Sequence, residues 1–306
     1  MADARLALVT TAGAWETDED AEPLVAALAE LSITAVAADW DDADRDWSEF
    51  ELVVLRSPWN YTDHVERFLA WAERVEAVST LVNPLSVLRW NTDKHYLDDL
   101  ARAGLPVVAT SFVHPDDPRP EDPTTDFPAH GMFVVKPAVS AGSKDTARYA
   151  EDEHDAAAAH VRRLLDRGRD VMIQPYMDAV DDHGETGMLF FDGEFSHAFR
   201  KGALLTAGVP DVGRLYAVEN IGPREPSAAE LALAHDVLEQ AARRFGGEPM
   251  VYDRVDVLPG ADGKPMLLEL ELAEPSYFLS TDPAGAHRAA AAYAHALERS
   301  RNGEGR

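Results

Sequence analysis

The feature that most restricts the fold of this chain is a pair of β-like runs around an Asp-Gly dipeptide, in the segment MVYDRVDVLPGADGKPMLLELEL. Asp-Gly is a preferred centre for a two-residue type I′ turn, so residues 262–263 predict an antiparallel hairpin. Counting outward from that turn pairs Asp256 with Glu269 and Arg254 with Glu271. The sequence therefore predicts three carboxylates on one face of a two-stranded ladder.

Side chains alternate between the two faces of a strand. On the second run, the alternation gives one apolar face of Leu268, Leu270 and Leu272, and it puts Glu269 and Glu271 on the other. Two full charges about 6.6 Å apart repel by about 2.5 kcal/mol at an effective dielectric constant of about 20. A solvated face that screens this repulsion is one interpretation of the pattern.

A bound cation is the other interpretation, because like charges directly opposite each other destabilise an ordinary sheet. The chain has no cysteine and this cluster contains no histidine, so the ligands would be oxygen atoms, which suit a hard ion such as Mg²⁺ or Mn²⁺. Mg²⁺ held by a few carboxylates usually completes its shell with water and substrate phosphates. The resulting hypothesis is a metal–nucleotide site, and it requires phosphate-binding cations elsewhere in the chain.

Composition argues against several other classes of function. The chain has 306 residues, of which 46% are hydrophobic, as is typical of a soluble protein with two or three compact units. Its 55 acidic residues against 28 basic ones give a net charge of −27, which argues against binding to nucleic acid or to anionic membranes. We find no signal peptide and no run of about 18 apolar residues, and we therefore expect a cytoplasmic protein.

The first part of the chain alternates strand-like and helix-like patterns. Residues 6–10, 34–40 and 50–57 are strand-like, and residues 19–31 are helix-like. This alternation predicts a parallel α/β unit resembling half of a Rossmann fold. The first strand is followed by TTAGAW, which has a single glycine, so the absence of a glycine-rich fingerprint argues against NAD binding.

Ligands of parallel α/β sheets bind beyond the carboxyl ends of the strands. The segment after the third strand therefore supplies candidate substrate contacts. Arg56 would hold a substrate carboxylate in a bidentate pair, with Trp59 and Tyr61 as walls of the pocket. Packing of the two aromatic rings under the following helix is an equally consistent interpretation.

The rest of the chain predicts a mixture of helices and strands. A helix over residues 91–104 would start at Thr92 and stop at Gly104, and an S-x-x-E capping box would start the helix over residues 228–247. Further helices are expected at 61–75, 152–168 and 286–300, strands at 80–84, 132–137 and 170–177, a hairpin at 187–201 about Asp192-Gly193, and long loops at 114–131 and 202–226.

Two lysines stand next to features that suit phosphate. Lys136 ends an apolar strand and precedes a small-residue loop, in which Ser140, Gly142 and Ser143 let backbone N–H groups approach a phosphate closely. Lys94 lies in the first turn of its expected helix, where a cation opposes the helix dipole, and this favours a functional role. For Lys136 alone, solvation at a strand edge is the alternative.

The order of these patterns resembles the ATP-grasp superfamily over nearly the whole chain. The resemblance rests on the helix with Lys94, the strand VVKP with its loop, the strand MIQPYM, the hairpin FFDGEFSHAFRK, the strand RVDV and the run LELELAEPS. ELVVLRSPWNY and LVNPLSVLRWNTDKHYLDDL are similar to the glutathione-synthetase branch. Within it, LRWNTDKHYL, VVKPAVSAG and LELELAEPS most resemble the cycloserine-synthetase group, cyclo-ligases that close O-ureido-serine into cycloserine.

The resemblance implies a fold and a division of the chain. The fold class would be α/β and α+β, with an N-terminal Rossmann-like substrate domain over residues 1–92. A central lid subdomain would follow over residues 93–173, and a C-terminal subdomain over residues 174–306. ATP would lie between the two ATP-grasp subdomains. The resemblance also implies a small amino-acid-like substrate, and it leaves open whether the protein is a monomer or a homodimer.

The resemblance also implies roles for individual residues. The expected ATP contacts are Lys94, Lys136, Ser140, Gly142, Ser143, Gln174, Pro175, Tyr176, Met177 and Glu185, and two Mg²⁺ ions would be held by Asp256, Glu269 and Glu271. Arg200 and Arg254 would act at the acyl phosphate, and Ser276 would lie near the substrate. Many relatives carry Asn where this chain has Glu271, and this difference would alter the charge balance at the metal. For Arg254, a simple ion pair across the hairpin is an equally consistent interpretation.

Such a site supports a two-step ligase reaction. A substrate carboxylate attacks the γ-phosphorus of ATP to form an acyl phosphate, while Mg²⁺ and the lysines neutralise the spreading charge, and an amine then displaces phosphate. The chain shows no convincing Ser-His or His-carboxylate arrangement, which agrees with this chemistry because the first step needs little acid–base machinery. The alternatives are an intermolecular amino-acid or peptide ligase and a non-catalytic nucleotide-binding module on the same fold.

Overall fold

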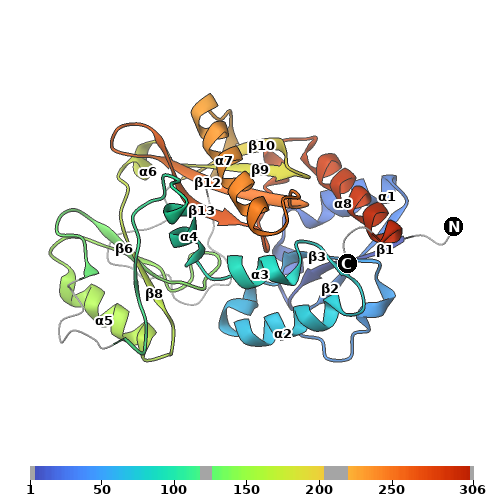
Figure 1. The fold of residues 1–306 in the computed structure, drawn as a ribbon, viewed down its shortest axis with the longest axis horizontal. Coiled ribbons are helices and arrows are strands. Elements are labelled where there is room, and N and C mark those ends of the chain that lie inside the picture. Colours follow the sequence, from blue (N-terminus) through green and yellow to red (C-terminus); the bar gives the residue numbers. More distant parts are fainter. Residues whose placement is uncertain (1–3, 118–125, 203–219, 304–306) are drawn as a thin grey trace.

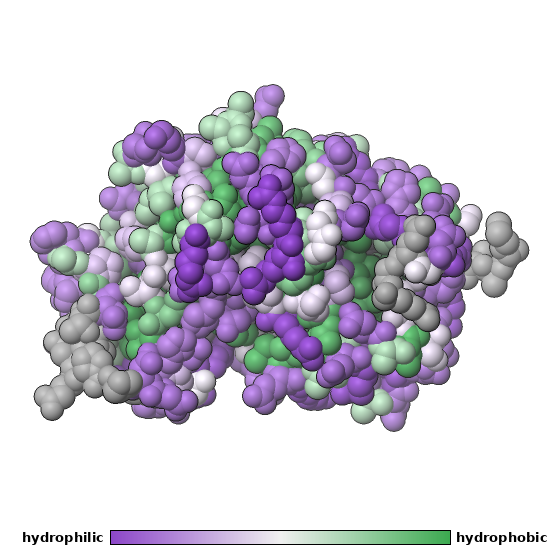
Figure 2. Space-filling model, viewed as in Figure 1, coloured by the Kyte–Doolittle hydropathy of each residue, from purple (hydrophilic) through white to green (hydrophobic). Residues whose placement is uncertain are grey.

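The computed structural model describes residues 4–117, 126–202 and 220–303, and these form three β-sheets with helices packed around them (Figure 1). A parallel sheet built from the start of the chain, the N-terminal sheet, lies at one end of the molecule. A second four-stranded sheet, the outer sheet, lies at the other end, and the five-stranded middle sheet lies between them. Hydrophilic residues cover most of the face seen in Figure 2, in keeping with the net charge of −27.

The N-terminal sheet has the strand order β2-β1-β3-β4, and all of its neighbours are parallel. Its strands are β1 (Ala4–Thr10), β2 (Ile33–Asp39), β3 (Leu52–Ser57) and β4 (Thr80–Leu81). Helix α2 (Val65–Glu76) packs on one face, and helices α1 (Ala21–Glu30) and α8 (Gly285–Asn302) pack on the other. Every residue of β3 is buried because both faces are covered. The expected Rossmann-like unit is confirmed.

The outer sheet has the strand order β5-β8-β6-β7 and is antiparallel throughout. Its strands are β5 (Ser111–Val113), β6 (Phe133–Pro137), β7 (Ala147–Tyr149) and β8 (Val171–Pro175), and helix α5 (His154–Leu165) packs on it. Strands β6 and β8 and helix α5 were expected from the sequence. Strands β5 and β7 were not, because three residues are too few to show a periodic pattern.

The middle sheet has the strand order β11-β10-β9-β12-β13, with antiparallel neighbours. Its strands are β9 (Glu185–Phe191), β10 (Glu194–Lys201), β11 (Ile221–Arg224), β12 (Tyr252–Pro259) and β13 (Pro265–Glu271). Helix α7 (Ala228–Arg244) packs on one face together with α4 (Tyr96–Arg102), whereas α8 packs on the other. Strand β11 lies in the span 202–226, which was expected to be a loop; residues 203–219 of that span lie outside the described residues.

Of the expected helix over residues 91–104, only α4 (Tyr96–Arg102) is present, because Asn91 is the last residue of the preceding helix. Helix α3 (Leu85–Asn91) ends at Thr92, whose hydroxyl donates back to the carbonyl of Leu88 at 2.8 Å, and α4 follows after a short link. The prediction of Thr92 as a helix N-cap is therefore wrong, because Thr92 bonds to the helix that precedes it. The link carries Lys94, whose backbone N–H donates to Ala138 of the outer sheet's loop. The helix-dipole argument for Lys94 consequently does not apply.

The β12–β13 hairpin has the expected pairing but not the expected turn. Asp256 and Arg254 face the two glutamates as predicted. The turn is a three-residue loop, in which Gly263 N–H donates to the carbonyl of Gly260 and Gly260 N–H donates to the carbonyl of Lys264. A type I′ turn needs positive φ at both central residues, and of the Asp-Gly dipeptide only the glycine, at 77°, has it.

A β-bulge restores the pairing that the longer turn would have shifted. The register changes by one residue between Asp256 and Val257, and the extra residue on the partner strand is Leu268. Leu268 lines the cleft described below and is not part of the core cluster that contains Leu267 and Leu270, although Leu270 also borders the cleft. The prediction that Leu268 shares a face with Leu270 is wrong, because it assumed uninterrupted alternation along the strand.

Several local predictions are confirmed. Asp192 and Gly193, with φ of 50° and 78°, form the two-residue turn between β9 and β10. Ser227 and Glu230 form the capping box of α7. Gly104, with φ of 92°, follows α4 as its stop. The remaining short helices are α6 (Ala179–Asp182) and the 3₁₀ turns Trp15–Thr17, Trp47–Glu49, Trp59–Asp63 and Leu279–Thr281.

The division of the chain at residues 92 and 173 stays a prediction. The three sheets take their strands from residues 4–81, 111–175 and 185–271, but α4 packs on the middle sheet and α8 joins the N-terminal sheet to it. Within the described part of the chain, no helix has the length and apolar character needed to cross a membrane.

Candidate active site

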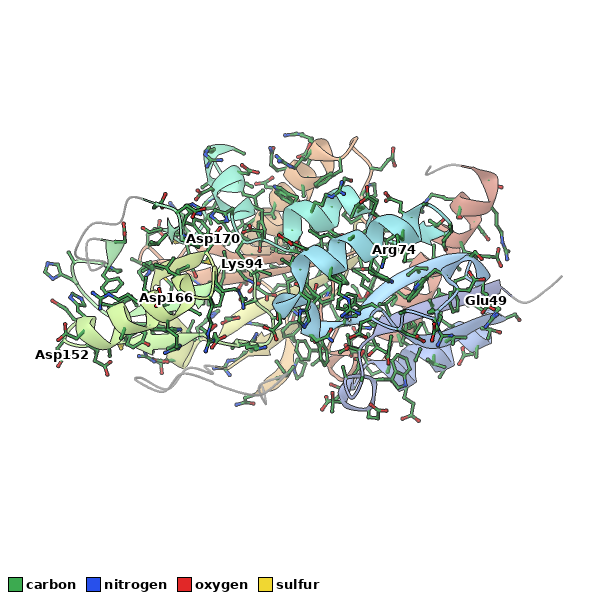
Figure 3. The ribbon with its side chains drawn as sticks, turned by 90° about the horizontal axis from the view of Figure 1, so that it is seen from below. Glu49, Arg74, Lys94, Asp152, Asp166 and Asp170 are labelled. Carbon is green, nitrogen blue, oxygen red and sulfur yellow. The ribbon has the colours of Figure 1, made fainter. Side chains whose placement is uncertain are left out.

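A cleft lies between the outer and middle sheets, and residues of the N-terminal unit line one end of it. Figure 3 shows Lys94 away from both ends of the molecule, with Glu49 and Asp152 at opposite ends. The lining residues are Trp59, Tyr61, Asn91, Thr92, Lys94, Val134, Lys136, Ser140, Ala141, Gly142, Ser143, Thr146, Gln174, Pro175, Tyr176, Met177, Val180, Glu185, Lys201, Arg254, Leu258, Leu268, Glu269, Leu270, Glu271, Glu274, Ser276 and Phe278.

The three carboxylates of the β12–β13 hairpin meet at one place beside the cleft. Asp256, Glu269 and Glu271 each offer an oxygen atom within 4.8 Å of the others. Arg254 donates to Asp256 from Nε at 2.9 Å and from Nη2 at 2.8 Å, and Nη2 also contacts Glu271. The predicted register thus does bring the carboxylates together, and Arg254 supplies part of the opposing charge.

Lys94 joins this carboxylate cluster to the small-residue loop of the outer sheet. Its Nζ lies 3.1 Å from Glu269 Oε1 and donates to the carbonyl of Ser140 at 2.8 Å. Burial raises the pKa of Glu269, but Lys94 and Lys136 outweigh this effect and lower it to about 2. Glu269 is therefore ionised at neutral pH.

Glu271 lies two positions further along β13 and has the opposite shift. Burial raises its pKa to about 8 against the effect of Arg254, and the neighbouring charges of Glu269 and Asp256 add to the rise. A divalent cation held by these oxygens would oppose that rise, because its positive charge favours the ionised carboxylate. The donor set, three carboxylates with neither sulfur nor imidazole, fits a hard ion such as Mg²⁺.

Two further lysines face the same space. Lys136 is partly exposed at the cleft, and its pKa is lowered by burial of its remaining surface, with Glu269 opposing the shift. Lys201 faces Glu185 across the β9–β10 ladder. Burial raises the pKa of Glu185 to about 7, against the opposing effect of Lys201. Together with Lys94, these lysines can neutralise a polyanion such as a chain of phosphates.

The loop and strand predicted to contact ATP form the outer-sheet wall of the cleft. Gly142 and Ser143 both have φ of 59°, which holds the loop in a tight left-handed conformation next to Ser140. Gln174 donates to the hydroxyl of Thr110 at 2.9 Å. The strand continues through residues that all line the cleft, namely Pro175, Tyr176 and Met177. Tyr176 is fixed by Arg148, whose guanidinium carbon lies 3.6 Å from the ring centroid.

The end of the cleft nearest the N-terminal unit is aromatic and acidic. Trp59 and Tyr61 line this end, as expected from their place after the third strand of the N-terminal unit. Both side chains are almost fully buried. Glu274 is hydrogen-bonded to the Tyr61 hydroxyl, and burial raises its pKa to about 7 against that bond's effect. The carbonyl of Ser276 accepts from Arg254 Nη1 at 3.3 Å.

Arg56 does not lie where the sequence suggested. Its side chain has no exposed surface and is absent from the cleft lining. Its Nη2 pairs with Asp18 at 3.1 Å and with Asp20 at 3.2 Å, while Nη1 donates to the carbonyl of Pro275 at 2.8 Å. The prediction that Arg56 clamps a substrate carboxylate is therefore corrected, since two buried carboxylates already occupy the guanidinium.

Arg200 also points away from the cleft. Its Nε donates to the carbonyl of His183 at 2.8 Å and its Nη2 to that of Asp182 at 3.1 Å. Alternation along β10 instead gives the cleft position to Lys201, the next residue. The expectation that Arg200 contacts the acyl phosphate is not supported by this placement, and Lys201 is the cation that this strand contributes.

Sequence reasoning missed Lys201 and Glu274. The turn at Asp192-Gly193 was recognised, but a β-bulge between Phe195 and His197 interrupts the alternation, so counting faces from the turn would not have placed Lys201 at the cleft. Glu274 follows the metal-type glutamates in the run LELELAEPS, but it lies beyond the end of β13, where the two-residue period no longer applies.

Comparison with known proteins gives the site a family. The chain is 42% identical over 301 residues to the cycloserine biosynthesis protein DcsG of Streptomyces lavendulae, covering 96% of this chain and 99% of that protein. The chain belongs to the DcsG family. Residues 6–83 match the family model for the N-terminal domain of the D-cycloserine synthetase DcsG.

Solved structures place this DcsG-family chain in the ATP-grasp fold. The crystal structure of D-cycloserine synthetase DcsG matches with a TM-score of 0.87 at 41% identity, covering 96% of this chain and 99% of that one. D-alanine–D-alanine ligase from Bacillus anthracis, complexed with ATP, matches with a TM-score of 0.69 at 15% identity, covering 99% and 100% of the two chains. The ATP-grasp ligase PsnB, complexed with a minimal precursor, matches with a TM-score of 0.60 at 18% identity, covering 97% and 99%. The last two similarities concern the fold alone and confirm the expected ATP-grasp fold, and the two DcsG matches confirm the resemblance to the cycloserine-synthetase group.

Proposed function

We propose that this chain is an ATP-dependent carboxylate–amine ligase that closes O-ureido-D-serine into D-cycloserine. The observation that carries the proposal is the constellation at the cleft: Lys94 bonds at once to Glu269 of the carboxylate cluster and to Ser140 of the small-residue loop. The chain is 42% identical to a cycloserine biosynthesis protein over nearly its whole length. The substrate is therefore inferred from the family, and the chemistry from the cleft.

In this proposal the outer sheet holds the nucleotide. Lys94 and Lys136 contact the phosphates, and the backbone N–H groups of the loop at Ser140, Gly142 and Ser143 approach them closely. Residues Gln174 to Met177 run along the adenine, with Glu185 nearby. Lys201 adds a third positive charge to the cleft. This charge offsets the additional carboxylate that the cluster carries because this chain has Glu271 where many relatives have Asn.

Asp256, Glu269 and Glu271 would hold two Mg²⁺ ions, with Mn²⁺ as a competent substitute. The ions supply neutralisation of the charge that spreads over the phosphoryl oxygens. Arg254 pairs with both Asp256 and Glu271, and these contacts hold the two carboxylates next to each other. The lysines then position the γ-phosphoryl group in line with the incoming substrate carboxylate.

The reaction proceeds through an acyl phosphate. One oxygen of the substrate carboxylate attacks the γ-phosphorus, the bond to the β-phosphate oxygen breaks, and ADP leaves. The nitrogen bonded to the substrate's side-chain oxygen then attacks the acyl carbon, phosphate leaves with the original carboxylate oxygen, and the ring closes. Formation of cycloserine also requires one water molecule to cleave the bond between the ring nitrogen and the carbamoyl carbon, so that this group leaves as carbon dioxide and ammonia and the nitrogen keeps a proton. Trp59 and Tyr61 wall the substrate end of the cleft and limit the access of water to the acyl phosphate.

A substrate screen tests this function. Purified protein with ATP and Mg²⁺ is offered O-ureido-D-serine, its L-enantiomer and a panel of amino-acid pairs, with ADP formation as the readout and mass spectrometry of the product. We expect ADP formation with O-ureido-D-serine and a product with the mass of cycloserine. Turnover only with amino-acid pairs would instead indicate an intermolecular ligase, and tight ATP binding without turnover would indicate a binding module.

The substrate end of the cleft suits a small polar molecule, and the acidic surface argues against nucleic acid or an anionic membrane as a partner. We place the reaction in the cytoplasm, where ATP is available. The protein would act as a monomer or a homodimer.

A further inference from the structure

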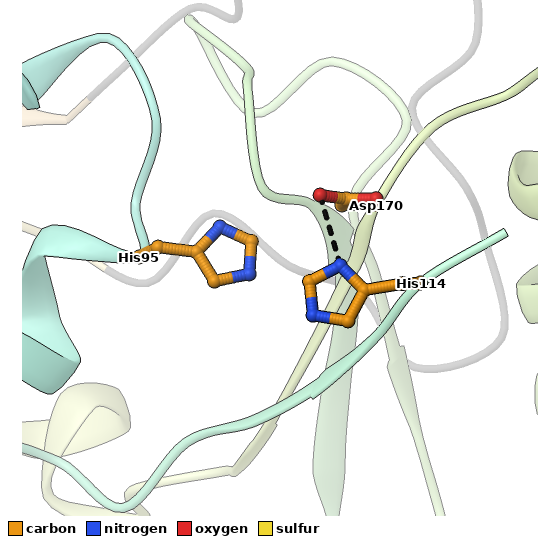
Figure 4. Close-up of side chains that lie close together, drawn as sticks. All are labelled: His95, His114 and Asp170. Atoms are coloured by element: carbon orange, nitrogen blue, oxygen red, sulfur yellow. Dashed lines mark ion pairs between the residues drawn. The ribbon is translucent and has the colours of Figure 1, made fainter. Parts of the chain in front are cut away.

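We propose a second metal site, specific for a divalent transition ion such as Zn²⁺, formed by His95, His114 and Asp170 (Figure 4). One ligand atom of each lies within 4.8 Å of the others. None of the three lines the cleft, so this site is separate from the carboxylate cluster that the proposed ligase function uses. Figure 3 shows Asp170 on the same side of the molecule as Lys94.

The fold brings the three ligands together from three segments. Strands β5 and β8 are antiparallel with Val113 opposite Val171, so the next residues outward, His114 and Asp170, face each other just beyond the ladder. His114 Nδ1 lies 3.1 Å from Asp170 Oδ2. His95 comes from the start of α4, and Figure 4 shows its ring turned toward the other two side chains.

A stacking contact and a hydrogen bond hold the ring of His95 in a defined orientation. Phe112 of β5 stacks on it with centroids 3.9 Å apart. His95 Nδ1 is 2.6 Å from Asp93 Oδ1, and the same oxygen accepts from the His95 backbone N–H at 3.1 Å. With the proton of Nδ1 donated to Asp93, the lone pair of the imidazole is on Nε2.

His95 Nε2 is buried and has no hydrogen-bond partner among the residues that the structure describes. A buried nitrogen without a partner costs free energy, and a metal ion would satisfy it. A carboxylate that fixes the far nitrogen of an imidazole is the usual companion of a metal-binding histidine, because it sets the tautomer and makes the ligating nitrogen more basic. Asp93 has that position relative to His95.

The donor set selects the kind of ion. Two imidazole nitrogens and one carboxylate oxygen suit Zn²⁺ and related first-row ions, whereas Mg²⁺ and Ca²⁺ prefer oxygen donors alone. Three protein ligands leave at least one coordination position for water. The His114 and Asp170 side chains are 43% and 32% exposed, so the ion has access from solvent. Once bound, it would fix the segment that carries Lys94, because His95 is the next residue.

Titration with Co²⁺ tests the proposal, since Co²⁺ bound to histidine nitrogen absorbs visible light and is displaced by Zn²⁺. The full chain, stripped of metals and with any affinity tag removed, is titrated in saturating Mg²⁺ so that the carboxylate cluster does not compete. We expect uptake of one equivalent. His95→Ala and His114→Ala should each weaken binding by about 100-fold or more, and Asp93→Asn by about 10- to 100-fold.

The matched control is His130→Ala, because His130 is also an exposed histidine with a carboxylate partner, Glu151, but lies outside the cluster. It should leave Co²⁺ uptake unchanged. Circular dichroism of each variant verifies folding, and Asp93→Asn keeps all three ligands and so still reports on the site if a ligand variant does not fold. Absence of uptake at millimolar Co²⁺, or unchanged uptake in the doubly substituted His95→Ala, His114→Ala chain, would overturn the proposal.

Discussion

At the scale of single residues, the site depends on where a few charges are buried. Glu269 is the centre of this arrangement, because it contacts Lys94 and lies opposite Asp256 in the hairpin. Glu269→Gln removes one negative charge and one metal ligand while keeping the shape of the side chain. We expect phosphate release to fall by about 100-fold or more, by analogy with the loss of one preorganised electrostatic contact. Glu248→Gln, at an exposed position, is the matched control.

Folding of the Glu269→Gln chain should be retained, which circular dichroism would verify. The raised pKa of Glu271 has Glu269 among its causes, so loss of that charge relieves repulsion within the cluster. Near-normal turnover in this variant would contradict the assignment of the carboxylate cluster to metal.

Arg56 is predicted to matter for stability rather than for substrate binding. Arg56→Met leaves Asp18 and Asp20 buried without their counter-charge, and the loss of one partner from a buried ion pair costs about 3–5 kcal/mol. The melting temperature should fall by several degrees. Arg5→Met, which breaks an exposed pair with Glu49, should change it little. An unchanged melting temperature with a raised KM for the amino-acid substrate would instead restore the role in substrate binding.

The sequence predicted which residues lie near the cleft. It was less successful in predicting which of their side chains point into it. Arg200 and Lys201 are neighbours, and only the face count along β10 separates them. Arg56 is the last residue but one of β3, near the strand end where a ligand-binding residue would lie, but Asp18 and Asp20 approach it from a segment distant in sequence that no local pattern reveals. Such long-range polar pairing is set by tertiary structure, and it limits what local patterns can predict.

At the scale of elements, the β12–β13 hairpin shows how two errors cancel. The turn is one residue longer than a type I′ turn, and the bulge at Leu268 inserts one residue into the partner strand. The pairing of Asp256 with Glu269 is therefore the one predicted, although both local features differ. The repulsion between the carboxylates, and the metal site inferred from it, depend on this pairing and are therefore unaffected by the two local differences.

Helix α5 supplies a test of pH dependence. His160 is buried there, with Nδ1 2.9 Å from the Tyr149 hydroxyl, and burial lowers its pKa to about 4, with Arg163 adding to the shift. The unfolded chain takes up this proton near pH 6.5, while the folded chain does so only near pH 4. Between these pH values the unfolded state binds more protons than the folded state. The free energy of unfolding therefore keeps its full value, as far as His160 is concerned, above pH 6.5 and decreases as the pH falls toward 4.

His160 alone lowers the free energy of unfolding by about 2 kcal/mol between pH 7 and pH 5. The His160→Gln chain should therefore lose less stability than the wild type over that interval, as measured by urea unfolding at both pH values. His130→Gln, at an exposed position, is the control. Equal losses in the wild type and the His160→Gln chain would show that His160 is not held neutral by burial.

At the scale of the whole molecule, the nucleotide would contact two sheets that are separate in the sequence. Residues of the outer sheet, such as Lys136, and of the middle sheet, such as Glu269, line one cleft. A ligand that binds only the folded chain stabilises it, by about 2.7 kcal/mol at 100 times its Kd. We expect ATP with Mg²⁺ to raise the melting temperature, and Lys136→Met to reduce that rise.

Lys264→Met is the control for that experiment, because Lys264 is exposed and forms a local ion pair with Asp262. It should leave the rise in melting temperature intact. If ATP with Mg²⁺ raises the melting temperature equally in the Lys136→Met and Lys264→Met chains, ATP binds somewhere other than this cleft.

In the proposed reaction the substrate carboxylate attacks the γ-phosphorus of ATP, and isotope transfer follows the carboxylate oxygen into the phosphate. O-ureido-D-serine labelled with ¹⁸O in both carboxylate oxygens is turned over with unlabelled ATP, and the released phosphate is analysed by mass spectrometry. An acyl phosphate intermediate predicts one ¹⁸O atom in each phosphate, because phosphate leaves with a carboxylate oxygen. Phosphate without ¹⁸O would contradict the account, since the oxygen would then have come from water.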